Sequence, residues 1–136
     1  MDPAVIKYYR KLLRGRFEYA GTIEEPSVFL DPVAEGERRI CGRPADYMKI
    51  YIKVKRGVIE DMKYLCLCDP TANVAIEVLS GLLKGKTLDA AAQVTSDRIL
   101  QEVGSDGEEL RTKSAALVEL IQKGLARYLK THDKGL

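Results

Sequence analysis

The chain has 136 residues, and its 22 basic and 20 acidic side chains leave a formal net charge of +2. This length fits one compact domain that buries its own core. So small a net charge excludes the strong basic footprint that is typical of non-specific nucleic-acid binding. No window of about 18 uninterrupted apolar residues is present to span a membrane. We therefore expect a single, soluble, cytoplasmic domain over residues 1–136 that binds neither nucleic acid nor membrane.

Few residues can act as soft metal ligands, because the chain has three cysteines and one histidine. An odd cysteine count in a chain of this size argues against a closed disulfide framework, so we expect free thiols in a reducing compartment. There is no glycine-rich phosphate loop, no serine-centred elbow and no pair of histidines. These absences come close to excluding catalysis by a classical triad.

The first element predicted is a helix over residues 3–14. Asp2 is a capping residue, Pro3 suits the first helical position, and apolar residues follow at helical spacing. Residues 15–38 contain several glycines and prolines, which predicts an irregular segment with a short strand near 17–22.

Residues 47–55 alternate between apolar and polar side chains, which predicts a strand with one buried face and one basic, aromatic face. Arg56-Gly57 predicts a tight turn into a second strand over 58–68. An edge strand at 38–42 would complete a three-stranded antiparallel sheet. The basic, aromatic face could stack single-stranded nucleic acid, but such a row is more often the solvated side of a sheet.

Helices follow the strands to the end of the chain. Asp69-Pro70 repeats the cap-then-proline signal and predicts a helix that stops at Gly85. Two short helices are predicted at 88–92 and 95–103, and a long amphipathic helix at 106–129. Strands followed by helices indicate an α+β fold in which the helices pack on one face of the sheet.

At the hairpin and the helix after it, the sequence resembles the NifU/IscU-type scaffold proteins of iron–sulfur cluster assembly. The likeness is carried by Asp46-Tyr47-Met48-Lys49, Ile52-Lys53-Val54, Ile59-Glu60-Asp61 and Leu83-Lys84-Gly85-Lys86-Thr87-Leu88-Asp89. The resemblance implies the same α+β fold. It also implies a site of three cysteines and a nearby carboxylate that holds a nascent cluster or zinc, because soft thiolates match iron and tolerate bridging sulfide.

Matched residue by residue, the family's carboxylate falls on Asp46, but its three cysteine positions fall on Pro44, Asp69 and Lys113. An ammonium group has no lone pair to give a metal, and we expect Lys113 on a solvated helix face. Capping of the following helix is enough to explain Asp69. The usual three cysteines are therefore missing from register.

The cysteines that are present lie close to those positions. A three-residue shift in the loop would let Cys41, expected to be the most exposed thiol, replace the first. Cys68 could replace the second, and Cys66, roughly 7 Å away along the strand, could be an auxiliary ligand. In that position Cys66 is more often a core residue. Cys41, Cys66, Cys68 and Asp46 would suit tetrahedral zinc or a [2Fe-2S] cluster.

Two hypotheses follow. The first is a divergent iron–sulfur cluster assembly scaffold, a carrier and not a turnover enzyme. It would bind a cluster, zinc or iron through Cys41, Asp46 and Cys68, with Cys66 in support. For this case the resemblance implies a cysteine desulfurase and iron–sulfur acceptor proteins as partners. The second, motivated by the missing register cysteines, is a paralogue without a cluster that serves as a protein-interaction or regulatory module.

Overall fold

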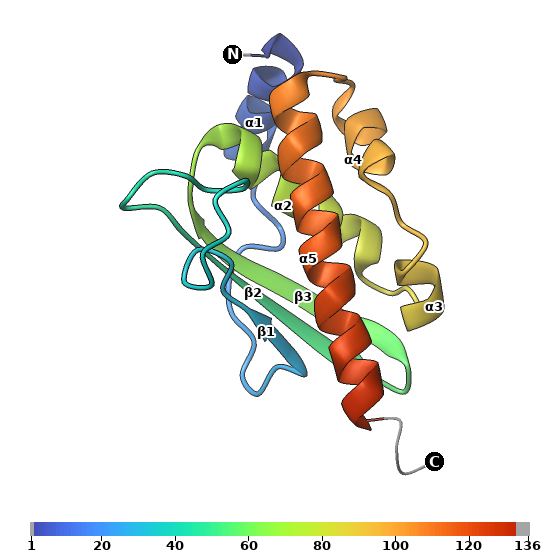
Figure 1. The fold of residues 1–136 in the computed structure, drawn as a ribbon. Helices are drawn as coiled ribbons and strands as arrows, with labels where there is room; N and C mark the ends of the chain where they lie inside the picture. Colours follow the sequence, from blue (N-terminus) through green and yellow to red (C-terminus); the bar gives the residue numbers. More distant parts are fainter. Residues whose placement is uncertain (1, 133–136) are drawn as a thin grey trace.

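The computed structural model describes residues 2–132 and has an antiparallel sheet beside a set of helices (Figure 1). The three strands lie in the order β1-β2-β3. The predicted α+β fold is thus confirmed. No helix within residues 2–132 is long and apolar enough to cross a membrane. The elements are α1 (Pro3–Arg14), β1 (Val28–Leu30), β2 (Tyr47–Lys55), β3 (Val58–Leu67), α2 (Pro70–Leu83), α3 (Leu88–Ala91), α4 (Ser96–Val103) and α5 (Glu108–His132).

Local signals set most of these boundaries. Asp2 accepts a hydrogen bond from the N–H of Ala4 at 2.9 Å, and Asp69 accepts one from the N–H of Ala72 at 2.9 Å. Both predicted caps are confirmed, because each carboxylate satisfies an amide that the first turn of a helix leaves without a partner. The last helix, α5, begins two residues later and ends three residues later than predicted.

The third strand is not where the sequence suggested it. The prediction of an edge strand at 38–42 is wrong, and β1 at Val28–Leu30 pairs with β2 instead. Val28 and Leu30 are buried on either side of the exposed Phe29. A strand of three residues is too short to show a clear alternation in the sequence. Ile40, in the segment predicted as the edge strand, is buried but lies in a loop.

The strand predicted near 17–22 is reduced to one bridge between Ala20 and Tyr64 on β3. In addition to this bridge, two lysines of the basic face hold the segment after α1 to the sheet. The Lys63 ammonium donates to the Glu18 carbonyl and the Lys53 ammonium to the Glu25 carbonyl, both at 3.1 Å. Part of the basic face is therefore occupied by the chain's own backbone.

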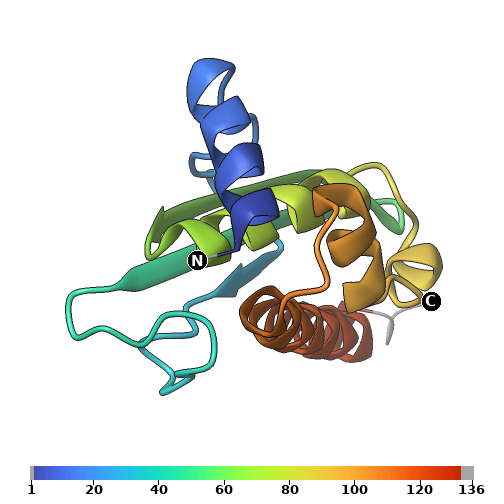
Figure 2. The same cartoon turned by 90° about the horizontal axis from the view of Figure 1, so that it is seen from above.

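The core lies between the sheet and two helices. Helices α2 and α5 lie side by side on one face, with α2 against β3 and α5 against β1 (Figures 1 and 2). Met48, Ile50 and Ile52 of β2 are fully buried, as their alternation predicts. Helix α4 covers α2 and α5, and α1 packs beside α2 and extends away from the sheet (Figure 2).

Glu77 on α2 is a buried carboxyl that anchors the irregular segment after α1. It accepts hydrogen bonds from the N–H groups of Glu18 at 3.0 Å and Tyr19 at 3.3 Å, and from the Tyr64 hydroxyl at 2.8 Å. Burial raises the pKa of Glu77 above its ordinary value, and these hydrogen bonds offset only part of that rise. The carboxyl thus ties the segment to both α2 and β3.

The Glu77→Gln substitution is expected to lower the free energy of unfolding by about 1–3 kcal/mol, because the amide NH₂ cannot accept from a backbone N–H. Glu102→Gln, on the exposed face of α4, is the control. Because the pKa of Glu77 is raised in the folded state, the contribution of this carboxyl to stability falls as the pH rises above 4.5 through that pKa. Urea unfolding across this range should show that the stability of wild type relative to Glu77→Gln falls as the pH rises. A difference that stays constant with pH would contradict the assignment.

Candidate metal centre

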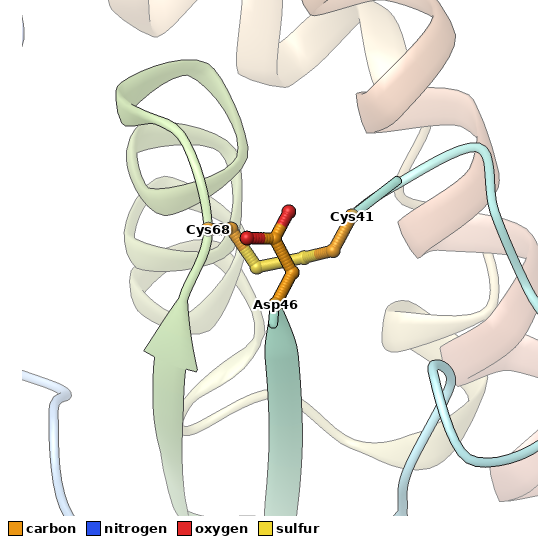
Figure 3. A group of neighbouring side chains, drawn as sticks. All are labelled: Cys41, Asp46 and Cys68. Atoms are coloured by element: carbon orange, nitrogen blue, oxygen red, sulfur yellow. A yellow bond between two sulfur atoms is a disulfide. The ribbon is translucent and has the colours of Figure 1, made fainter. Parts of the chain in front are cut away.

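Cys41, Asp46 and Cys68 meet at the end of the sheet where β2 begins and β3 ends (Figure 3). Asp46 directly precedes β2, and Cys68 lies between β3 and the cap of α2, while Cys41 comes from the loop before β2. One ligand atom from each residue lies within 4.8 Å of the other two. Two sulfurs and a carboxylate are thus brought together from two segments, the loop that leads into β2 and the end of β3.

The two sulfurs are joined. Cys41 and Cys68 form a disulfide with their Cα atoms 5.6 Å apart, so the expectation that all three cysteines are free thiols is wrong (Figure 3). The expectation of an exposed Cys41 is also wrong, because this residue is 0% exposed. The loop turns Cys41 into the core, whereas Cys68 stays partly exposed. Of the two bonded residues, only Cys68 is therefore partly exposed.

Asp46 is held by a small turn of its own. Its carboxylate accepts a hydrogen bond from the Arg43 N–H at 3.1 Å, and its N–H donates to the Arg43 carbonyl at 3.1 Å. These two bonds close the loop just before β2 and fix the carboxylate beside the disulfide (Figure 3). One carboxylate oxygen is used in this turn, which leaves the other for a ligand.

Cys66 lies outside this group, although the sequence suggested it as an auxiliary ligand. It is the free cysteine, partly buried on β3 opposite Met48. Burial, followed by the nearby Asp69 carboxylate, raises the pKa of Cys66 to about 12, so it stays a protonated thiol at neutral pH. The structure thus brings three of the four predicted residues together.

Lys113 on α5 is part of the centre, and the prediction that it is a solvated surface residue is wrong. Its ammonium donates to the Ile40 carbonyl at 2.6 Å and pairs with the Asp69 carboxylate at 3.2 Å. Only 11% of its side chain is exposed. Lys113 thus connects the residue before Cys41 to the residue after Cys68. The helical pattern could not reveal this contact, because it places Lys113 off the apolar stripe.

The Lys113→Met substitution is expected to lower the free energy of unfolding by about 1–3 kcal/mol, because it leaves Ile40 without its donor and Asp69 without its counter-charge. Lys123→Met on the same helix is the matched control. Lys123 pairs with Glu119 on the surface, and the loss of such a pair costs about 0.3–0.5 kcal/mol. Guanidinium unfolding of the three proteins compares them, and equal losses in both variants would exclude a special role for Lys113.

The donor set fits a soft metal only after reduction. In the disulfide neither sulfur is a thiolate, and the thiolate is the form that binds metals. Reduction would give two thiolates and the Asp46 carboxylate, a three-ligand set that leaves one position of a tetrahedral zinc ion open. The same set, with soft sulfur and one lability-tuning oxygen, suits an iron–sulfur cluster.

Comparison with known proteins gives related sequences. A family model described as the NifU-like N-terminal domain matches residues 17–134. Two Archaeoglobus fulgidus proteins, the iron–sulfur cluster assembly scaffold proteins IscU 1 and IscU 2, are each 27% identical to this chain over 95 residues. That stretch is 70% of this chain and 60% of each relative, so the chain spans less than two thirds of their length.

Solved structures share the fold at low sequence identity. The N-terminal part of a nitrogen-fixing NifU-like protein from Brucella abortus has a TM-score of 0.61 and 15% identity, over 96% of this chain and 94% of that one. A Fervidobacterium islandicum protein described as a cluster assembly scaffold for the SUF system has a TM-score of 0.51 and 14% identity, over 95% and 86%. At these identities the likeness supports the fold alone.

Proposed function

Since the chain belongs to the NifU-like N-terminal domain family of iron–sulfur cluster assembly scaffolds, we propose that its reduced form carries an iron–sulfur cluster or a zinc or iron ion. Cys41, Cys68 and Asp46 would be the ligands. The observation that carries this proposal is the convergence of their ligand atoms within 4.8 Å. Cys66 is left out of the proposed ligand set because it lies outside that group.

The surroundings of the three ligands support an anionic site that gains from a cation. Two thiolates and a carboxylate carry three negative charges, which a divalent ion largely neutralises. The Lys113 ammonium and the Asp69 carboxylate beside them form a pair with no net charge. Because Asp69 also caps α2 and Lys113 also holds Ile40, neither is free to move onto the metal. The open ligand position would face incoming sulfide or an acceptor's ligand.

In this proposal the metal or cluster is cargo, and the protein is a carrier that does not turn over a substrate. Membership of the scaffold family supports a cysteine desulfurase as the sulfur donor and iron–sulfur proteins as acceptors.

Anaerobic reconstitution tests the proposal. The reduced wild-type chain is incubated with ferrous iron and sulfide, and separately with zinc, and is then desalted for visible absorption and metal analysis. We expect one zinc ion per chain, or a coloured protein with matching iron and sulfide. The Cys41→Ser/Cys68→Ser double variant should stay colourless and metal-free. A reduced wild type that also stays metal-free would refute the proposal and favour a protein-interaction module.

A further inference from the structure

The Cys41–Cys68 disulfide closes the proposed site, because it uses the two sulfurs that a metal needs as thiolates. Its two ends differ in access. Cys41 is 0% exposed, whereas Cys68 is partly exposed at the end of β3. An incoming thiolate must approach a disulfide sulfur from the side opposite to its partner sulfur. Only Cys68 can be attacked without opening the core.

We infer that this chain undergoes thiol–disulfide exchange at Cys68 with a dithiol protein, and that the exchange opens the Cys41–Asp46–Cys68 site to metal. The second half of this inference rests on the proposed function. The first half stands on the accessibility of the two sulfurs and on the surface around Cys68.

The exchange proceeds in two balanced steps. A thiolate of the dithiol protein attacks Cys68 Sγ, a new S–S bond forms to the reductant, and the Cys41–Cys68 bond breaks. The electron pair of that bond leaves on Cys41 Sγ, which takes a proton. The second thiolate of the reductant then attacks the reductant's first sulfur and breaks the mixed disulfide. Cys68 Sγ leaves with the electron pair and takes a proton. Overall two electrons and two protons pass from the dithiol to this chain, and the reductant becomes a disulfide.

The structure holds partners for the reduced form. Cys68 Sγ lies 3.3 Å from the Tyr47 carbonyl oxygen, a distance at which a reduced Cys68 thiol donates a hydrogen bond. The Lys113 ammonium binds the Ile40 carbonyl directly before Cys41 and keeps this loop in place when the disulfide is broken. The two sulfurs therefore remain close enough to bind one metal after reduction.

The surface beside Cys68 favours a protein over a small thiol as the reductant. Leu67 directly precedes Cys68 and is 55% exposed, and Tyr47 opposite it on β2 is 42% exposed. Exposed apolar side chains in a cluster are typical of protein contact sites. A dithiol protein can cover Tyr47 and Leu67 while its thiolate reaches Cys68, whereas a small thiol gains little from them.

A trapping experiment tests the site of exchange. The oxidised chain is incubated with a thioredoxin whose resolving cysteine is replaced by serine, and peptide mapping locates the mixed disulfide. We expect the adduct on Cys68, and none with the Cys68→Ser variant. An adduct on Cys41 or Cys66, or no adduct at all, would overturn the inference. It would also be overturned if the chain, purified without reductant, still had three free thiols.

The rates of disulfide reduction test whether the surface beside Cys68 favours a protein reductant. Intact thioredoxin should reduce the disulfide at least about tenfold faster than glutathione at equal thiol concentration, and equal rates would overturn the assignment to a dithiol protein. Leu67→Ser should slow the thioredoxin reaction by about fivefold. Leu13→Ser is the matched control, since Leu13 is 59% exposed on α1 and should leave the rate unchanged.

Metal binding separates the two proposals. Zinc uptake should follow the reduction in time and be absent from the oxidised chain. Exchange at Cys68 without any zinc or cluster uptake would refute the proposed function and the opening of a metal site, and would leave the exchange itself standing. Equal zinc uptake by the oxidised and reduced chains would overturn the gating half alone.

Discussion

The Cys68→Ser substitution is expected to weaken metal binding by the reduced protein at least about 100-fold, since even outer partners of a metal ligand contribute 10–100-fold. The hydroxyl that replaces the thiolate is not ionised at neutral pH. Cys68 is the better position for this test than Cys41, because Cys68 is partly exposed whereas Cys41 is fully buried in the core. Zinc affinity can be measured by competition with a chromophoric chelator.

Cys66→Ser is the matched control for that experiment. It removes a sulfur two residues away on the same chain segment, but one that lies outside the group of converging ligands. We expect its zinc affinity to stay within about twofold of wild type, because it removes no ligand. Equal losses in the two variants would show that Cys66 binds the metal, and a loss in Cys66→Ser alone would refute the proposed ligand set.

The second large effect expected is on stability. Oxidation of Cys41 and Cys68 should raise the free energy of unfolding by about 3–4 kcal/mol, because the bond joins residues 27 apart and restricts the unfolded chain. This is a large part of the about 5–15 kcal/mol that is typical of a folded domain. The measurement is urea unfolding of the oxidised and reduced protein under anaerobic conditions.

Two variants make this stability measurement specific. The Cys66→Ser protein keeps the disulfide and should show the same difference between its oxidised and reduced forms. The Cys41→Ala/Cys68→Ala protein cannot form it, and its stability should not respond to reductant. Coincident unfolding curves for oxidised and reduced wild type would mean that the bond does not constrain the unfolded chain.

Much of the fold could be predicted because its signals are local. Asp2-Pro3 and Asp69-Pro70 each place a capping carboxylate and a proline at the start of a helix, and both helices begin there. The alternation over 47–55 likewise specifies which face of β2 is buried. The strand β1 escaped prediction because three residues carry too little pattern, and its pairing with β2 is a contact between distant segments.

In the candidate metal centre, too, some features could be predicted from the sequence and others depend on the tertiary structure. The residue types that suit a soft metal, two cysteines and the Asp46 carboxylate, were visible in the sequence, and so was the shift of Cys41 and Cys68 from the family's positions. Their convergence, the burial of Cys41 and the exclusion of Cys66 depend on how the loop before β2 folds back against the end of β3. No spacing in the sequence encodes that path.

Composition and periodicity by themselves determined the fold class and most helix boundaries, and the family resemblance pointed to the small set of residues able to bind a soft metal. The tertiary structure alone decided that two of the three thiols form a disulfide and that Lys113 lies at the centre. The physical reason is the sequence separation over which each interaction acts. Caps, turns and alternation act within a few residues, whereas a disulfide across 27 residues and the contact from Lys113 to Ile40 exist only once the core has brought those segments together.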